Sequence, residues 1–329
     1  MFFFLFFLLF NLLLFFYFKK FSEYICLYDY PDNIRKFQKN PVALTGGFIV
    51  FINLLVFFIF KSFQYFYFSI YFEDSYFNFF IFFFFLTLFF FIGFLDDKYS
   101  LGPNLKLFLF SICIIGLLYF SENLALTSLK FSFIEKSLNI SSVAFPFTLL
   151  CIVLFLNAFN MFDGINLQSA VYSLSIFFLF IFKDIFIDIS IIMILSLLFF
   201  SYLNFKNKCF LGNNGALVIA FVISYLFIKS QSSANPFFAD EIFLAMQIPG
   251  LDLLRLAIQR ILEKKHPFYP DRNHIHHLLI KRYGLKKTLF FLLSLIIIPN
   301  FLSVLFGNTF YYIILSLIIY LLIIFKLKK

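Results

Sequence analysis

The sequence predicts an all-α polytopic membrane protein of about eleven transmembrane helices, with its N-terminus outside and its C-terminus in the cytoplasm. Three observations lead to this fold class: the composition, a series of long apolar runs, and the distribution of Lys and Arg. Hydrophobic residues make up 63% of the chain and charged residues only 13%. A water-soluble domain of this composition would expose a continuous apolar surface, which soluble proteins avoid. We therefore treat residues 1–329 as a single integral-membrane domain.

The apolar runs are each close to the roughly 17–25 residues that cross the hydrocarbon layer as a helix. They lie near residues 2–18, 44–60, 77–95, 105–120, 143–160, 167–182, 185–202, 214–229, 237–254, 288–306 and 309–325. The first run resembles a signal peptide, but it lacks a basic leading segment and a cleavage site of small residues, and Lys19 and Lys20 follow it. We expect it to be a retained helix.

The basic residues give the orientation. If residue 1 is outside and the spans alternate, 21 of the 26 Lys and Arg residues fall on the cytoplasmic side. Acidic residues divide almost evenly, so the bias is the one that orients membrane proteins. The net charge of +9 then needs no nucleic-acid partner, and we expect a multi-pass protein of the inner (cytoplasmic) membrane. The cytoplasmic loops are expected near residues 19–43, 96–105, 157–166, 203–214 and 255–287.

Polar residues gather at the end of one apolar run. Asn157, Asn160 and Asp163 recur every three residues, so on a helix end they would share one face. Amide and carboxylate groups on such a face suit a cation, a phosphate or the edge of a sugar. The alternative is a helix end that simply meets water, where Asn and Asp before Gly make a stop signal.

Two further cytoplasmic stretches carry polar groups. A span ends in the adjacent carboxylates Asp96 and Asp97, and Lys106 follows at the start of the next span. Neighbouring carboxylates repel, which a divalent cation or a bound phosphate proton would relieve, although an acidic turn facing water is the simpler reading. Residues 210–216 form a Gly-rich turn that opens a helix, where backbone N–H groups could approach an anion; an ordinary turn is the alternative.

Histidines mark the largest cytoplasmic loop. All four lie between residues 266 and 277. Together with Arg272, the residues His274, His276 and His277 make a donor-rich patch suited to a pyrophosphate, or to a metal ion when the rings are neutral. A zinc site would usually add Cys or Glu at helical spacing, and the four cysteines form no C-x-x-C pair. Phosphate contact is therefore favoured over structural zinc.

Five motifs in this order resemble one known family. The sequence reads Thr45-Gly-Gly47, Asp96-Asp97, Asn157-x-x-Asn-x-x-Asp-Gly164, Phe210-Leu-Gly-Asn213 and Asp271-Arg-Asn-His-Ile-His-His277. Across about residues 40–290 it is similar to the polyprenyl-phosphate N-acetylhexosamine-1-phosphate transferases, which have a multi-span fold and a cytoplasmic active site.

The resemblance implies a phosphoglycosyl transferase. Such an enzyme transfers a HexNAc-1-phosphate from a UDP-N-acetylhexosamine, here most simply UDP-GlcNAc, to undecaprenyl or another polyprenyl phosphate and releases UMP. It depends on Mg²⁺, with Mn²⁺ as an alternative ion, and begins the synthesis of a cell-surface polysaccharide such as O-antigen. A homodimer formed through the spans is an open alternative to a monomer.

The resemblance also implies site residues. The candidate catalytic residues are Asp96, Asp97, Asp163 and His276. The candidate substrate contacts are Lys106, Asn157, Asn160, Asn166, Arg272, His274 and His277. The candidate metal ligands are Asp97, Asn160, Asp163 and Asn213.

Two positions depart from the family pattern, because Asn166 and Asn213 stand where relatives usually have Asp. Each Asn brings no charge, so Mg²⁺ affinity is expected to fall unless the remaining carboxylates compensate. The changes suit either another donor sugar or a catalytically weakened member of the fold. A transporter or flippase is the alternative from another class, but its polar groups would be expected near the bilayer midplane and in repeated segments.

Overall fold

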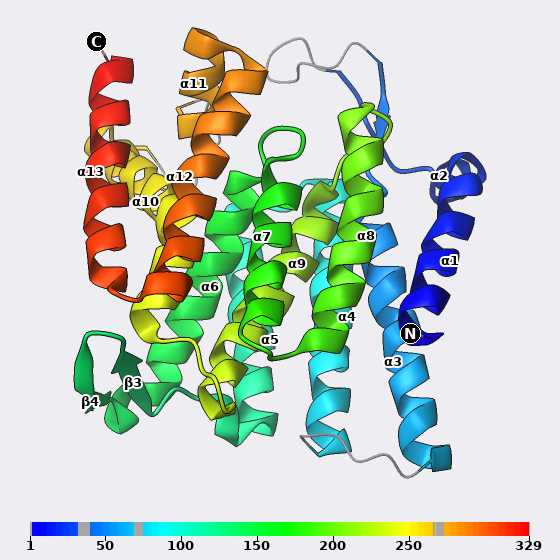
Figure 1. Ribbon diagram of the computed structural model, residues 1–329. Coiled ribbons are helices and arrows are strands. Elements are labelled where there is room, and N and C mark those ends of the chain that lie inside the picture. Colours follow the sequence, from blue (N-terminus) through cyan, green and yellow to red (C-terminus); the bar gives the residue numbers. More distant parts are fainter. Residues whose placement is uncertain (1, 32–39, 69–74, 266, 268–272, 329) are drawn as a thin grey trace.

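The computed structural model describes residues 2–31, 40–68, 75–265, 267 and 273–328, and this part of the chain is almost entirely helical (Figure 1). The α-helices are α1 Phe2–Phe16, α2 Phe18–Ile25, α3 Gly46–Phe68, α4 Tyr76–Tyr99, α5 Pro103–Phe120, α6 Ala144–Phe162, α7 Gln168–Phe182, α8 Ile187–Phe205, α9 Gly212–Lys229, α10 Ala239–Leu262, α11 Ile275–Tyr283, α12 Leu285–Phe306 and α13 Thr309–Lys328. The strands pair as two antiparallel ribbons, β1 Tyr28–Asp29 with β2 Val42–Ala43, and β3 Ser128–Phe131 with β4 Ile134–Asn139.

The helices agree with the predicted spans in position. Each of the eleven apolar runs coincides with a helix. Within the described residues, eight helices are long and apolar enough to cross a membrane, or nine if α1 and α2 form one bent span. The 15-residue α7 and the more polar α10 lie outside that set. The chain is therefore a polytopic membrane protein, and the number eleven stays a prediction.

The first predicted span ends differently from the expectation. Helix α1 stops at Phe16, and α2 continues at an angle of 68° to it. In α2, Phe18 and Ser22 are buried, whereas Lys19 and Lys20 are exposed. One apolar and one basic face are typical of a short helix that lies along a membrane surface.

Helix α9 is the centre of the bundle. Every residue from Asn214 to Ile228 is buried, and α9 packs against α3, α4 and α6. By contrast, only 17% of an 18-residue apolar segment of α13 is buried, and α13 lies at the edge of the bundle (Figure 1). Because lipid is as apolar as the side chains, close helix packing rather than water exclusion holds such a core together.

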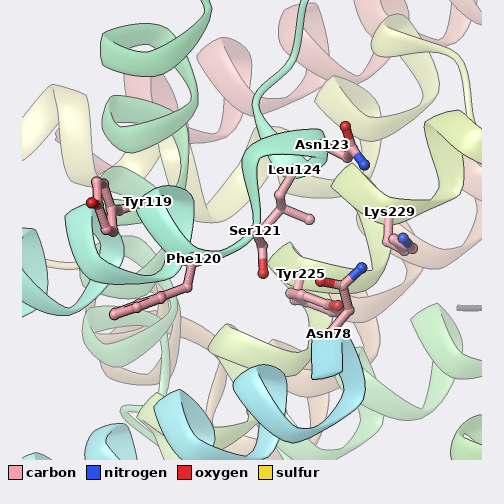
Figure 2. A pocket seen from close by; sticks show the side chains of 8 residues that line it. All are labelled: Asn78, Tyr119, Phe120, Ser121, Asn123, Leu124, Tyr225 and Lys229. Atoms are coloured by element: carbon pink, nitrogen blue, oxygen red, sulfur yellow. The ribbon is translucent and has the colours of Figure 1, made fainter. Parts of the chain in front are cut away.

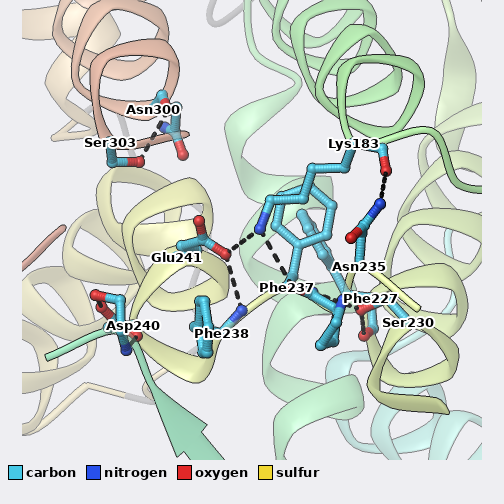
Figure 3. Close-up of polar contacts among 12 residues, drawn as sticks. Lys183, Phe227, Ser230, Asn235, Phe237, Phe238, Asp240, Glu241, Asn300 and Ser303 are labelled. Carbon is cyan, nitrogen blue, oxygen red and sulfur yellow. Dashed lines mark hydrogen bonds and ion pairs between the residues drawn. The ribbon is translucent and has the colours of Figure 1, made fainter. Parts of the chain in front are cut away.

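Polar contacts fix the end of the bundle that carries the β3–β4 ribbon. Lys183 donates from Nζ to Glu241 Oε2 at 2.6 Å and to the Pro236 carbonyl at 3.2 Å (Figure 3). Next to Glu241, Asp240 accepts hydrogen bonds from the backbone N–H of Ser132 at 2.9 Å and from its hydroxyl at 2.5 Å. These contacts join the N-terminal end of α10 to α7 on one side and to the β3–β4 ribbon on the other.

A cavity of about 300 Å³ opens at this same end, where α4 begins and α5 and α9 finish (Figure 2). It is lined by Asn78, Tyr119, Phe120, Ser121, Asn123, Leu124, Tyr225 and Lys229. None of the described residues predicted to form the site lines it. The described residues of the predicted site belong to the opposite end of the bundle, where α4 and α6 finish and α9 and α11 begin (Figure 1).

Candidate active site

Asp97 joins the end of α4 to the beginning of α9. Its Oδ1 accepts the backbone N–H of Asn213 at 2.8 Å, and its Oδ2 accepts the backbone N–H and the side-chain amide of Asn214 at 3.0 and 2.5 Å. A carboxylate here satisfies N–H groups that a helix N-terminus leaves without partners, and it faces the positive end of the helix dipole. Asp97 therefore fixes the Gly-rich turn, with about one of its acceptor sites left over.

Two glycines make this junction possible. A Cβ atom on Gly47 of α3 would lie 1.7 Å from Asn214 Oδ1 and 2.2 Å from the backbone nitrogen of Gly215. On Gly93 of α4, it would lie 2.4 Å from Asn214 Cα. Real Cβ atoms do not come this close, so α3 and α4 can touch the first turn of α9 only without side chains. The Thr45-Gly-Gly47 motif thus has a packing role.

Asp96 faces another helix. Its Oδ2 pairs with Lys106 Nζ at 3.0 Å, and its Oδ1 accepts the backbone N–H of Leu101 at 2.9 Å. Adjacent residues of a helix point about 100° apart, which is why Asp96 faces α5 while Asp97 faces α9. The two carboxylates do not form one shared site, and Lys106 neutralises Asp96.

Asp163 lies just beyond the last turn of α6. It accepts a hydrogen bond from the Ser169 hydroxyl through Oδ1, and within the described residues its Oδ2 accepts none. Burial raises the pKa of Asp163 to about 6; the Ser169 hydrogen bond opposes that rise, and the negative charge of Asp97 adds to it. Asp97 therefore lies close enough to disfavour the charge of Asp163, which a bound cation would relieve.

His276 of α11 lies directly against this turn. A Cβ atom on Gly164 would be 2.1 Å from His276 Nε2, so only glycine leaves room for the ring. The His276 side chain is 1% exposed, and neither ring nitrogen has a hydrogen-bond partner in the described part of the chain. Burial, together with the neighbouring histidines, lowers the pKa of His276 well below its ordinary value. A neutral imidazole with two unpartnered nitrogens thus borders Gly164, the residue after Asp163.

Asn166 is turned towards the loop between α8 and α9. Its side-chain nitrogen donates to the carbonyl of Asn204 at 2.9 Å and to Asn207 Oδ1 at 2.6 Å. Asn204 also accepts the backbone N–H of Leu167 at 2.7 Å and donates to the Cys209 carbonyl at 2.8 Å. An Asp at position 166 could not donate these hydrogen bonds, so the departure from the family pattern matches a contact between two loops.

The other described residues of the predicted site lie in the same region. Asn157 donates to the Val153 carbonyl of its own helix at 2.8 Å. The side chains of Asn160 and Asn213 are partly exposed, one at the end of α6 and the other at the start of α9. The ring of His277 lies 4.3 Å from that of His276, between centroids. Arg272 lies outside the described residues.

Sequence reasoning missed a cluster centred on Asp252 of α10. Its carboxylate contacts His274 Nδ1 at 2.9 Å, Arg255 Nη2 at 2.7 Å and the Tyr320 hydroxyl at 3.4 Å. The cluster draws on α10, α11 and α13. One signal was present in the sequence, because Asp252 lies inside an apolar run, three residues before Arg255, and a charged residue there is costly unless it is paired.

The residues fit Mg²⁺ better than zinc. Among the described residues, no group of three or more His, Cys, Asp and Glu side chains is arranged to hold a metal ion. Zinc normally requires such a set, whereas Mg²⁺ is held by one or two carboxylates and completes its shell with water and phosphate oxygens. Asp163 with its free Oδ2, beside Asp97, is a donor set of the second kind.

The fold and this arrangement define a class: a polytopic membrane protein with a carboxylate and histidine site at one end of its helical bundle. Residues 79–231 match the model of glycosyl transferase family 4. This match covers the middle of the chain and falls on the kind of enzyme that the sequence motifs resemble.

The chain is also similar to named relatives. The chain is 30% identical over 197 residues to a probable undecaprenyl-phosphate N-acetylglucosaminyl 1-phosphate transferase of Bacillus subtilis (strain 168), covering 57% of this chain and 54% of that protein. Undecaprenyl-phosphate alpha-N-acetylglucosaminyl 1-phosphate transferases of Yersinia pestis and Escherichia coli (strain K12) are each 25% identical. The Yersinia match covers 84% of this chain and 76% of that protein, and the Escherichia match covers 85% and 76%.

Proposed function

We propose that this protein transfers GlcNAc-1-phosphate, or another HexNAc-1-phosphate, from a UDP-sugar to undecaprenyl phosphate and releases UMP. One observation carries the proposal: Asp97, which caps the first turn of α9, raises the pKa of Asp163, and the buried ring of His276, which has no hydrogen-bond partner among the described residues, packs against Gly164 next to Asp163. The family and the names of the relatives support the same reaction class. The product would begin a cell-surface polysaccharide such as O-antigen.

The chemistry requires a dianionic lipid phosphate to attack a pyrophosphate, so the site must bring anions together and orient them in line. The neutral ring of His276 can donate a hydrogen bond from one nitrogen to a pyrophosphate oxygen and can accept a hydrogen bond at the other nitrogen. His274 and His277, with Arg272, would contact the same pyrophosphate. Asp97 would orient the lipid phosphate through the turn that it holds, and Lys106 would sit near it as a cation paired with Asp96.

Mg²⁺ would be held mainly by Asp163, with Asp97, Asn160 and Asn213 as the remaining candidate ligands. When bound, the ion supplies charge neutralisation for the pyrophosphate and for the attacking oxygen. Asn157 and Asn166 would border the nucleotide-sugar pocket, with the amide of Asn166 already committed to the neighbouring loop. Mn²⁺ would be accepted at the same position.

The site is proposed to face the cytoplasm. All eleven predicted spans would then be used, with α7 and α10 included, the N-terminus outside and the C-terminus inside. The excess of Lys and Arg at the site's end of the bundle supports this orientation. The protein would lie in the inner membrane, where UDP-sugars are available from the cytoplasm.

The test is UMP release by the detergent-purified protein. The assay offers undecaprenyl phosphate, Mg²⁺ and a panel of UDP-N-acetylhexosamines, with and without EDTA. We expect release that requires the lipid and the metal, and a loss of about 100-fold or more in Asp163→Asn, since a charge that stabilises the transition state is removed. The matched control is Asp188→Asn, a carboxylate that pairs with Lys61 at the other end of the bundle and should leave activity unchanged.

Equal activity of Asp163→Asn and the wild type would contradict the assignment of the site. No release with any donor, from protein shown to be folded, would favour a catalytically weakened member of the family. In that case Asn213→Asp is the better substitution with which to try to restore activity. Asn166→Asp would set a carboxylate against the Asn204 carbonyl and Asn207 Oδ1, two acceptors that now receive hydrogen bonds.

A further inference from the structure

The first turn of α11, which carries the histidines, is held by one carboxylate from α10. Asp252 is 5% exposed. Its Oδ2 lies 2.9 Å from His274 Nδ1, and the backbone N–H of Ile275 donates to both carboxylate oxygens at 3.2 and 3.3 Å. His274 is the N-cap residue of α11, so Asp252 grips the helix at its cap and at its first residue.

Two other side chains lock this carboxylate in place. Arg255 donates from Nη2 to Asp252 Oδ1 at 2.7 Å and to the Asn273 carbonyl at 2.6 Å, and from Nε to the Tyr320 hydroxyl at 3.2 Å. Tyr320 of α13 also lies 3.4 Å from Asp252 Oδ1. Asp252 thus receives hydrogen bonds from a guanidinium, the main chain and a phenol, which is the setting of an ionised carboxylate.

This setting fixes the tautomer of His274. An ionised carboxylate only accepts hydrogen bonds, so His274 must donate from Nδ1, which leaves Nε2 for a substrate. The ring of His274 is nearly parallel to that of His276, with 5.4 Å between centroids and 9° between planes. The orientation of His274 is therefore transmitted to the ring that lies against Gly164.

We infer that Asp252 is a positioning residue of this active site: it acts through His274, setting that ring and the first turn of α11 so that the histidines face the Asp163 turn. The inference rests on the proposed function for the reaction that these histidines serve. Arg255 and Tyr320 keep Asp252 in its place.

The geometric part can be tested without activity. The chain has four histidines, so nitrogen NMR of histidine-labelled protein gives few imidazole signals, and His274→Gln assigns one of them. We expect His274 to show a protonated, hydrogen-bonded Nδ1 that changes in Asp252→Asn. An unchanged His274 signal in Asp252→Asn would overturn the inference.

The functional part is tested by a double-substitution cycle on UMP release. Asp252→Asn should lower kcat by about 10- to 100-fold, the usual cost of losing the partner that orients a functional histidine, while KM for the polyprenyl phosphate stays the same. In a His274→Gln background, the same substitution should cost little more. An equal further loss there would show that Asp252 does not act through His274.

Asp240→Asn is the matched control, because it removes another buried α10 carboxylate at the opposite end of the helix. It should retain wild-type kcat, and an equal loss in Asp240→Asn would attribute the effect to general damage to α10. If the wild type releases no UMP, the proposed function fails, and the NMR result alone decides whether Asp252 positions His274.

Discussion

At the scale of single residues, substitution of His276 should affect the stability of the protein and its activity in different ways. A buried polar group without a partner costs free energy in the folded state, so removing it is neutral or stabilising. We predict that His276→Leu keeps the melting temperature or raises the unfolding free energy by up to about 1 kcal/mol. The same variant should lose UMP release, as measured beside its thermal unfolding in detergent. A strongly destabilised variant would show that His276 has partners that stabilise the fold.

The same histidine gives a pH dependence of known sign. The pKa of His276 is far below the ordinary value of about 6.5 that applies in the unfolded chain. As pH falls below about 6.5, the unfolded state binds a proton that the folded state does not, so stability is present at higher pH and is lost on acidification. Between pH 7.5 and 5.5 the wild type should lose up to about 1.4 kcal/mol more than His276→Leu.

Thermal unfolding of both proteins in EDTA at the two pH values measures this difference. Other titrating groups are common to the two proteins and cancel. Asp163 would act in the opposite direction, because its raised pKa favours the folded state at low pH. A wild type that loses no more stability than the variant would contradict a neutral, buried His276.

At the scale of elements, the contact between α3 and α9 should tolerate no side chain. Gly47→Ala places a Cβ atom against Asn214 and Gly215, and we predict a loss of about 1–3 kcal/mol together with lost activity, because the turn held by Asp97 must move. Gly250→Ala in α10 is the control, since nothing lies within 4 Å of the new Cβ atom. That substitution should be neutral or stabilising by about 0.5–1 kcal/mol.

Melting temperatures and UMP release of the two alanine variants check this prediction. Equal melting temperatures and equal UMP release in Gly47→Ala and Gly250→Ala would contradict the close contact between α3 and α9.

Much at this scale could be predicted from sequence, because hydropathy alone locates a helix that must satisfy its backbone in lipid. All eleven apolar runs are helices, and the described residues of the polar motifs lie at one end of the bundle. The bend after Phe16 and the helix α11 were not predicted, since amphipathic and short segments carry no strong hydropathy signal.

Which site residues contact one another could not be predicted from the sequence. Which way Asp96 and Asp97 point depends on helix phase and on which helix lies opposite, so one pairs with Lys106 and the other with the α9 turn. The role of Asp252 depends on a contact across 22 residues of chain. Motif spacing alone gives neither.

At the scale of the whole molecule, the orientation makes a prediction. Single cysteines are introduced at Lys208, beside the site, and at Ser132, in the β3–β4 ribbon, after the native cysteines are replaced. An impermeant maleimide applied to intact cells should label position 132 and not position 208, because the Lys and Arg bias predicts that the site is inside. The reverse labelling pattern would show that the protein has the opposite orientation, with the site on the side of the membrane away from the nucleotide-sugar.

The central claim is that this site moves a sugar phosphate and not a sugar. The most direct measurement uses UDP-GlcNAc labelled with ³²P at the β-phosphate, together with undecaprenyl phosphate, Mg²⁺ and the purified protein. We predict that the label appears in the lipid fraction while unlabelled UMP is released, and that Asp163→Asn and EDTA each prevent it. Label that stays in the aqueous fraction as UDP while sugar enters the lipid would contradict phosphoglycosyl transfer.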